Sequence, residues 1–191
     1  MPWGIWLFLC PYNVSFSWPH ENTRASIFAA MQRREVYATT DPRITVRMFG
    51  SWNFDSLDEH TPNLARTGYS RGVPMGGDLG PVQLGRAPTL LVGALRDQEG
   101  PNIDRIQIIK GSRDVDGELH EKIYNVAMSG DRLVRPNGSV MPVENSVKVD
   151  DSNWENSIGT AQLQGRWRDP DFNVHEHAFY YLRVLDIPAP R

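Results

Sequence analysis

The densest group of polar side chains that could do chemistry lies where the one predicted helix of the chain gives way to a strand. Its members are Arg24, Tyr37, Thr39, Thr40 and Arg43. Arginine presents a planar fork of donors that suits phosphate or carboxylate, and tyrosine and threonine hydroxyls can orient an anion. These residue types indicate an anion-binding pocket. The alternative, favoured because ion pairs are common where charges cluster, is that the arginines pair with Glu21, Glu35 or Asp41.

A second candidate, for metal binding, is the run His175-Glu176-His177. Alternate residues of a strand face the same side, so two imidazoles could share one ion. Two ligands do not close a site, however, and the sequence has no third ligand with recognisable spacing and no His-Glu-x-x-His helix. We therefore predict no metal site in this chain and favour an exposed turn before the last strand. A small intact metalloenzyme that uses His20, His175 and His177 is the least favoured hypothesis.

The remaining motifs favour turns over catalysis. Asp114, Asp116 and Glu118 could offer oxygen ligands to calcium, but the DVDGE stretch lacks the EF-hand pattern, and Asp-Gly is a strong hairpin signal. The sequence has no Gly-x-Ser-x-Gly elbow, and its single cysteine, Cys10, lacks the flanks of known catalytic cysteines. Nucleophilic catalysis thus has no support in the sequence.

Charge and hydropathy exclude two classes of partner. The formal net charge is -3 and the basic residues are scattered, whereas nucleic-acid binders gather lysine and arginine on one surface. No window approaches the roughly 18 consecutive apolar residues that a membrane helix needs. We expect a soluble protein without a nucleic-acid partner or a membrane span, and the sequence does not choose between cytoplasm and periplasm.

The periodicity of apolar residues predicts a mainly β (α+β) fold, an antiparallel β-sandwich-like domain with one N-terminal helix. Helical spacing is sustained only over residues 21–35, and an alternating strand pattern follows at residues 44–48. Residues 52–85 are rich in Asp, Asn, Pro and Gly and indicate loop with short strands. Further strands are expected at residues 90–95, 103–109, 122–128, 160–167 and 179–187. The extended junction at residues 37–43 should lie against both helix and sheet.

The first eighteen residues are apolar and aromatic, without the basic region or cleavage site of a secretory signal. Trp3, Trp6, Phe8 and Leu9 at a free terminus would form an adhesive patch. We therefore expect this segment to expose apolar surface that needs a covering partner.

An ordered series of segments gives the chain a specific resemblance to one protein family. The segments are ENTR, RREVYATTDPRITVRMFG, WNF, GYSRGVPMGGDL, DRIQIIKG, EKIYNVAMSGDR, DPDF and AFYYLRVLDIPAPR. From Trp18 to Arg191 the chain resembles the C-terminal part of a large bacterial family catalogued as domain of unknown function 3604. That family is related to PHP-type metal-dependent phosphoesterases and to the CehA–McbA-like metallohydrolases.

The resemblance implies a division of the chain into three parts. Residues 1–20 would be an atypical lead-in that does not match the family and that suggests a truncated or mis-started gene product. Residues 21–50 would complete a missing upstream metallohydrolase domain, which would be the partner of this chain. Residues 51–191 would form a β-rich C-terminal domain. Family members carry their metal ligands in upstream Asp-x-His and Ser-Asp-Thr-His motifs, which this sequence lacks.

The resemblance also implies which residues lie nearest the pocket of the complete enzyme. They are Glu21, Asn22, Arg24, Tyr37 and Arg43. Their role would be to orient substrate or the groups around the metal, since the divalent metal expected in the full-length family would be held upstream. We expect a fragment of a PHP-like hydrolase of unknown substrate that is inactive alone. The alternative is a stand-alone β-sandwich that binds a protein or a ligand through exposed aromatic residues and sheet edges.

Overall fold

The computed structural model describes residues 13–40, 42–83, 85–135 and 138–190 and has more strand than helix. The helices are α1 (Arg24–Gln32), α2 (Ser56–Glu59) and α3 (Leu64–Arg71). Every strand pair is antiparallel. The predicted mainly β class with antiparallel sheets is therefore confirmed. Among the residues described, no helix is long and apolar enough to cross a membrane.

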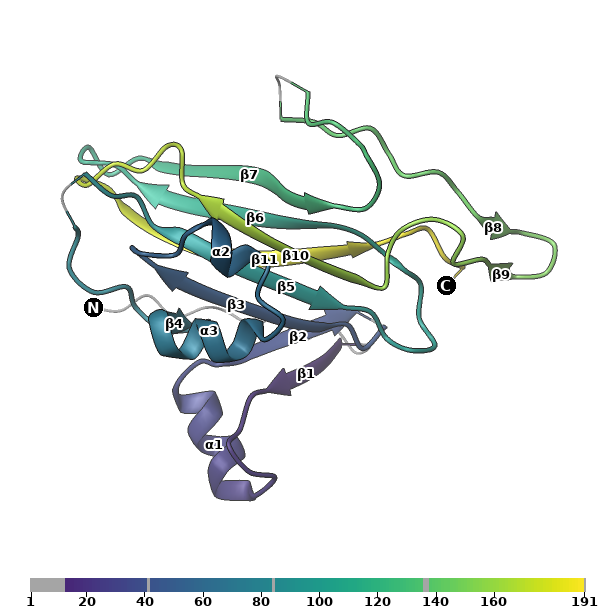
Figure 1. The fold of residues 1–191 in the computed structure, drawn as a ribbon, viewed down its shortest axis with the longest axis horizontal. Helices are drawn as coiled ribbons and strands as arrows, with labels where there is room; N and C mark the ends of the chain where they lie inside the picture. The colour runs from purple at the N-terminus through teal and green to yellow at the C-terminus, as the bar shows by residue number, and fades with distance from the viewer. Residues whose placement is uncertain (1–12, 41, 84, 136–137, 191) are drawn as a thin grey trace.

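Two larger sheets make up the body of the molecule (Figure 1). One orders β10 (Gln162–Arg168), β5 (Thr89–Leu95), β3 (Thr45–Ser51) and β4 (Val73–Pro74). The other orders β11 (His177–Asp186), β6 (Ile103–Arg113) and β7 (Leu119–Met128). Two-stranded sheets pair β1 (Asn13–Ser17) with β2 (Val36–Thr40) and β8 (Val147–Lys148) with β9 (Asn153–Trp154). The strands predicted at residues 90–95, 103–109, 122–128, 160–167 and 179–187 correspond to β5, β6, β7, β10 and β11.

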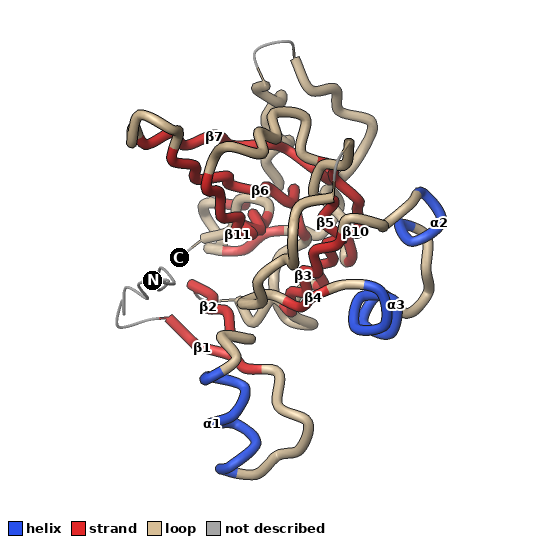
Figure 2. The backbone as a smooth tube through the Cα atoms, turned by 90° about the vertical axis from the view of Figure 1, so that its left-hand side faces the viewer, coloured by secondary structure: helices blue, strands red, loops and turns tan. Residues whose placement is uncertain are grey.

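The two larger sheets share one hydrophobic core. Val46 and Val92 from the first sheet are buried in the same cluster as Ile106 and Ile108 from the second. Their neighbours along the strands point to the opposite faces of the sheets, where Leu91 of β5 and Ile109 of β6 are buried as well. Figure 2 shows the second sheet on the side of the body away from α2 and α3.

Helices α2 and α3 cover the other face of the first sheet. They lie in a part of the chain for which the sequence predicts no helix. The sequence predicts one helix, and a loop with one or two short strands over residues 52–85, whereas the described residues form three helices, two of them within 52–85. Asp55 caps α2 in a capping box with Asp58, and Asn63 caps α3. Gly68 of α3 lies on the ring of Phe49, where a Cβ would come within 2.2 Å of the ring. These two helices are too short for their apolar residues to show a helical period. They are held instead by their N-caps and by the close approach of Gly68 to Phe49.

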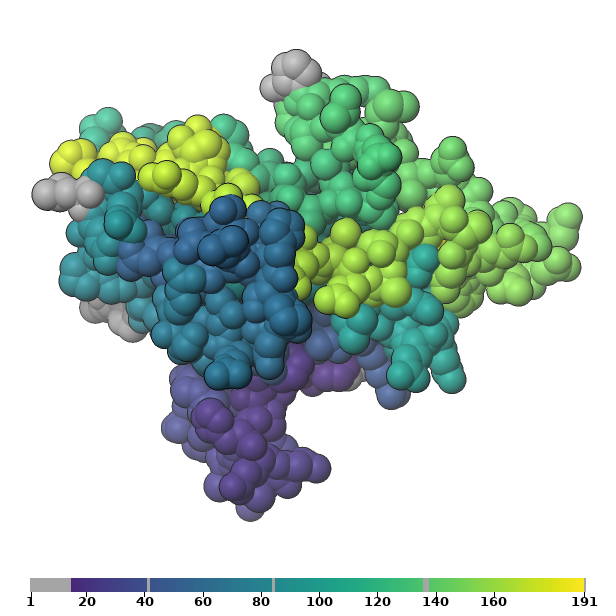
Figure 3. Space-filling view, viewed as in Figure 1, coloured from purple at the N-terminus to yellow at the C-terminus, as the bar shows by residue number. Residues whose placement is uncertain are grey.

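The N-terminal strands and helix form an arm, defined as residues 13–40, that projects from the body (Figures 1 and 3). Helix α1 begins after Thr23, whose hydroxyl accepts a hydrogen bond from the backbone N–H of Ser26. Its bounds fall inside the predicted residues 21–35. Strand β2 is extended, as predicted, and Tyr37 packs against the shared core. The prediction for Trp3, Trp6, Phe8 and Leu9 falls outside the residues that the structure describes.

A buried ion pair joins the second sheet to the turn before β11. The Lys110 ammonium is 2.7 Å from the Asp169 carboxylate, and the two side chains are 5% and 0% exposed. The Tyr180 hydroxyl donates to the same carboxylate at 2.6 Å, and burial followed by this bond raises the pKa of Tyr180. The Lys110 ammonium also donates to the backbone oxygen of Asp171 at 2.7 Å. The pair therefore fixes the DPDF turn against the sheet.

Replacing Lys110 with Met is expected to lower the free energy of unfolding by about 3–5 kcal/mol, because it leaves the Asp169 carboxylate buried without its cation. The measurement is urea denaturation of both proteins. Lys148→Met is the matched control, since Lys148 pairs with Glu155 at the surface and its loss should cost less than about 1 kcal/mol. Equal losses in the two variants would contradict a structural role for the buried pair.

An ion pair at the exposed turn between β6 and β7 makes the stability of this turn depend on pH. Hydrogen bonding to Asp114 raises the pKa of His120 above 6.5, and the same bond lowers the pKa of Asp114 below 3.8. The contribution of His120 to the stability of the fold is present below pH 6.5 and is lost as pH rises through its raised pKa. The contribution of Asp114 is present above pH 3.8 and is lost as pH falls through its lowered pKa. Titration of the His120 ring by NMR should give a pKa that returns towards 6.5 in Asp114→Asn. A His120 pKa that is the same in both proteins would exclude the pairing.

Candidate functional site

The arm is joined to the body by one buried carboxylate, that of Glu35. Glu35 follows α1 and its side chain is only 2% exposed. Arg33 lies 3.3 Å and Arg47 of β3 lies 3.8 Å from its two oxygens, and the Tyr69 hydroxyl of α3 donates to it. A buried carboxylate is stable only when it is paired and hydrogen-bonded. Glu35 therefore ties the arm to two elements of the body at once.

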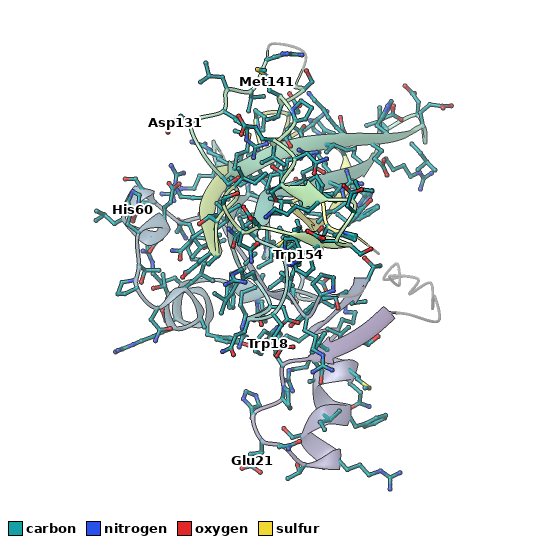
Figure 4. All side chains as sticks on the ribbon, turned by 90° about the vertical axis from the view of Figure 1, so that its right-hand side faces the viewer. Trp18, Glu21, His60, Asp131, Met141 and Trp154 are labelled. Atoms are coloured by element: carbon teal, nitrogen blue, oxygen red, sulfur yellow. The ribbon has the colours of Figure 1, made fainter. Side chains whose placement is uncertain are left out.

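Aromatic rings complete this junction. The guanidinium of Arg47 lies 3.2 Å from the centre of the Trp18 ring and donates to the Tyr69 hydroxyl at 2.9 Å. Trp18 in turn stacks on Tyr37, and its backbone N–H donates to the backbone oxygen of Glu35 at 3.1 Å. In Figure 4, Trp18 lies where the arm meets the body. Arg47 is thus held between a ring of the arm and a ring of the body, a geometry that favours a cation.

A second contact fastens the turn that follows α1. Arg34 has a positive φ of 62°, and its side chain forms an ion pair with Asp78 at 3.1 Å. Gly76, with φ 81°, lies so close to the backbone of Arg34 that a Cβ would come within 2.3 Å of the Arg34 oxygen. Glycine is needed there for both reasons. The segments RRE and GYSRGVPMGGDL, which are distant in the sequence, therefore meet at the base of the arm.

The electrostatics of this junction favour a structural role, which is to hold the arm in place, over a catalytic one. Burial raises the pKa of Tyr69, and its hydrogen bond to Glu35 raises it further. Burial likewise raises the pKa of Tyr37. The Tyr69 phenol is therefore kept as a neutral donor to Glu35, and the Glu35 carboxylate is turned inward towards Tyr69 and the two arginines. The group is a positioning device for the arm, because its carboxylate is closed to solvent.

The structure distributes the five predicted pocket residues over three places. Glu21, Asn22 and Arg24 are exposed at the outer end of the arm, where Figure 4 labels Glu21. Tyr37 is half-buried at its base. Arg43 is exposed beyond β2, and its backbone N–H donates to Asp97 at 3.0 Å, which is the main cause of the lowered pKa of Asp97. Within this chain the five do not converge on one pocket.

The residues that converge at the junction differ from those that the sequence predicts for a pocket. The sequence predicts Glu35 as an ion-pair partner of Arg24 or Arg43, whereas in the structure it pairs with Arg33 and Arg47. The signal in the sequence for this junction is the family resemblance, since RRE and GYSRG belong to the segments that carry it. His175 and His177 are exposed at the start of β11, and the described residues contain no group of three or more metal-ligating side chains that could share an ion.

Comparison with models of known protein families gives a match over most of the chain. A family model described as "Protein of unknown function (DUF3604)" matches residues 11–191. The matched region begins before Trp18, the start of the resemblance described above. No curated protein and no solved structure matches the chain.

Glu35→Gln is expected to lower the free energy of unfolding by about 1–3 kcal/mol, because the half-buried Arg47 loses its counter-charge while the side-chain shape is kept. Hydrogen exchange should become faster in β1 and β2. Asp78→Asn is the control, because Asp78 also holds the arm but is 81% exposed, and its loss should cost under about 1 kcal/mol. Unchanged exchange in β1 and β2 of Glu35→Gln would remove Glu35 as the tie between arm and body.

Proposed function

The chain belongs to the DUF3604 family, and on that premise we propose that it is the C-terminal, non-catalytic portion of a PHP-like metal-dependent hydrolase of the phosphoesterase type. In this proposal the arm completes the metal domain, and the two larger sheets form a β-sandwich that carries it. The divalent metal would be bound by residues of the metal domain. No step of the reaction is assigned to a metal ligand in this chain.

The observation that carries the proposal is the uncovered face of α1. Phe28 and Met31 are 60% and 54% exposed, and Ala30 is the buried residue of this helix. Figure 3 shows the arm protruding from the body. Large apolar side chains on a protruding helix mark a surface that another domain covers. A two-stranded sheet is also only marginally stable by itself and gains from such a partner.

The metal domain would cover the arm on the side where three of the predicted pocket residues lie. Arg24 begins α1, and Glu21 and Asn22 precede it. Their exposed side chains would reach substrate or the groups around the metal once the domain is complete, with Arg24 suited to an anionic oxygen. Glu35 would set their position indirectly, because it fixes the arm that bears them.

The proposal predicts that activity needs both parts. The chain alone and a fusion to a metal domain of the family are assayed for phosphate-ester hydrolysis with added zinc, manganese or iron. We expect metal-dependent turnover from the fusion and background rates from the chain. Arg43→Ala in the fusion should lower kcat/KM by about tenfold. Metal-dependent turnover by the chain alone would overturn the proposal, and an unchanged Arg43→Ala rate would remove the pocket role of that residue.

A double substitution on the exposed face of α1 tests the proposed docking surface directly. Phe28→Ser with Met31→Ser should weaken association between the separately produced metal domain and the chain by about tenfold or more, because both side chains would be buried in that contact. Leu57→Ser is the matched control, since Leu57 is 81% exposed on α2 of the body. Equal association by both variants would show that α1 is not the docking surface.

A further inference from the structure

The outer face of the second sheet carries a different and unexplained set of side chains. Across β11, β6 and β7 the register places three cross-strand rows on this face. The rows are Phe179–Gly111–Glu121, Tyr181–Ile109–Ile123 and Arg183–Gln107–Asn125. The intervening residues Tyr180, Leu182 and Val184 point inward to the shared core. Figure 2 shows β11, β6 and β7 on the side of the body away from α2 and α3.

Two aromatic rings lie open on this face. Phe179 and Tyr181 are 60% and 41% exposed, their ring planes differ by 15°, and their ring centroids are 6.3 Å apart. The tip of the Phe179 ring occupies the space above Gly111, where a Cβ would come within 2.3 Å of it. The missing side chain of Gly111 thus lets the ring lie across the sheet. Ile109, between Tyr181 and Ile123, is only 1% exposed and fills the floor beside the rings.

A ladder of hydrogen-bonding side chains borders the rings. The Arg183 guanidinium donates twice to the amide oxygen of Gln107, at 2.9 and 2.7 Å. The Gln107 amide donates to Asn125 at 2.8 Å, and Asn125 donates to the backbone oxygen of Gly138 at 2.9 Å. Each link fixes the orientation of the next side chain. Guanidinium and amide groups retain further donors and acceptors beyond these bonds.

The ladder leads into a cleft of about 390 Å³. Its lining includes Arg105, Gln107, Ile123 and Asn125, with Gly138 and Val140 from the loop after β7. This volume lies in the range of about 300–1,000 Å³ that is usual for small-molecule sites. An apolar platform, an oriented polar ladder and a cleft therefore adjoin one another on one side of a rigid sheet.

From this combination we infer that the outer face of β11, β6 and β7 binds an oligosaccharide. A pyranose ring has an apolar face of C–H groups that fits the open face of an aromatic ring, and hydroxyls at its edge that need closely spaced donors and acceptors. Phe179 and Tyr181 supply the platforms for successive sugar rings. Asn125 binds the hydroxyls of a unit in the cleft, the buried Gln107 holds Asn125 and Arg183 in place, and Arg183 adds affinity for a unit that bears a carboxylate.

Charge argues against a nucleic acid as the ligand of this surface, and location distinguishes the surface from the proposed hydrolase contact. The net charge of -3 opposes a nucleic-acid ligand, which would also present flat rings. The apolar helix face proposed as the hydrolase contact belongs to α1 of the arm, whereas this surface belongs to the second sheet of the body. The inference therefore does not rest on the proposed hydrolase function, and either could fail alone.

The test is titration of the full chain with neutral cello-oligosaccharides and with oligogalacturonates, followed by NMR and calorimetry. We expect binding that shifts the resonances of Phe179 and Tyr181 and that weakens by about tenfold in Phe179→Ala or Tyr181→Ala, given the usual strength of ring stacking. Phe179→Leu keeps apolar cover over Gly111 but removes the flat ring, and it should weaken binding similarly. Arg183→Gln should weaken binding of the uronate oligomers more than that of the neutral ones.

Leu57→Ala, on α2, is the control and should bind as the unchanged chain does. Circular dichroism of each variant checks that the fold is kept. Absence of shifts with every oligosaccharide would overturn the inference, as would full binding by Phe179→Ala and Phe179→Leu. If a second copy of the chain or another protein occupies these rings and no sugar competes with it, the saccharide assignment is wrong.

Discussion

The position of the whole arm depends on the need to satisfy one buried carboxylate. Glu35 comes at the end of the helix of the arm and is closed to solvent, so it must find its partners inside the molecule. It finds them on β3 and α3, in Arg47 and Tyr69. Because these donors belong to separate elements, Glu35 ties the arm to both of them at once. The surface that the arm offers to another domain follows from this constraint.

Strand β6 has a comparable part in the body, because both of its faces are used. Ile106 and Ile108 seal the core between the two sheets, while Ile109 closes the floor of the outer face. Lys110 reaches the buried Asp169 and holds the turn that leads into β11. Burial on both faces makes the strand rigid. The rings and amides of the outer face therefore have a fixed base, as a preorganised site requires.

Two surfaces with different chemistry result, one apolar on a projecting helix and one mixed aromatic and polar on a sheet. A hydrolase portion that contacts its metal domain through the first surface would leave the second open to solvent. If that surface binds sugars, the β-domain would bring the catalytic domain to a carbohydrate-bearing substrate or surface. The two proposals are compatible in this way, and they depend on separate residues and separate measurements.

The sequence by itself determined the mainly β class, the longest helix and the principal strands, because these follow from apolar periodicity along the chain. It could not show that Glu35 pairs with Arg47 and Tyr69, since the spacing between them carries no signal. The sequence also did not predict the short helices α2 and α3, because they lack a helical period of apolar residues. They depend on their N-caps and on the contact of Gly68 with Phe49. Which residues meet was decided by the tertiary structure alone, since burying charges and rings brings together segments that are far apart in the chain.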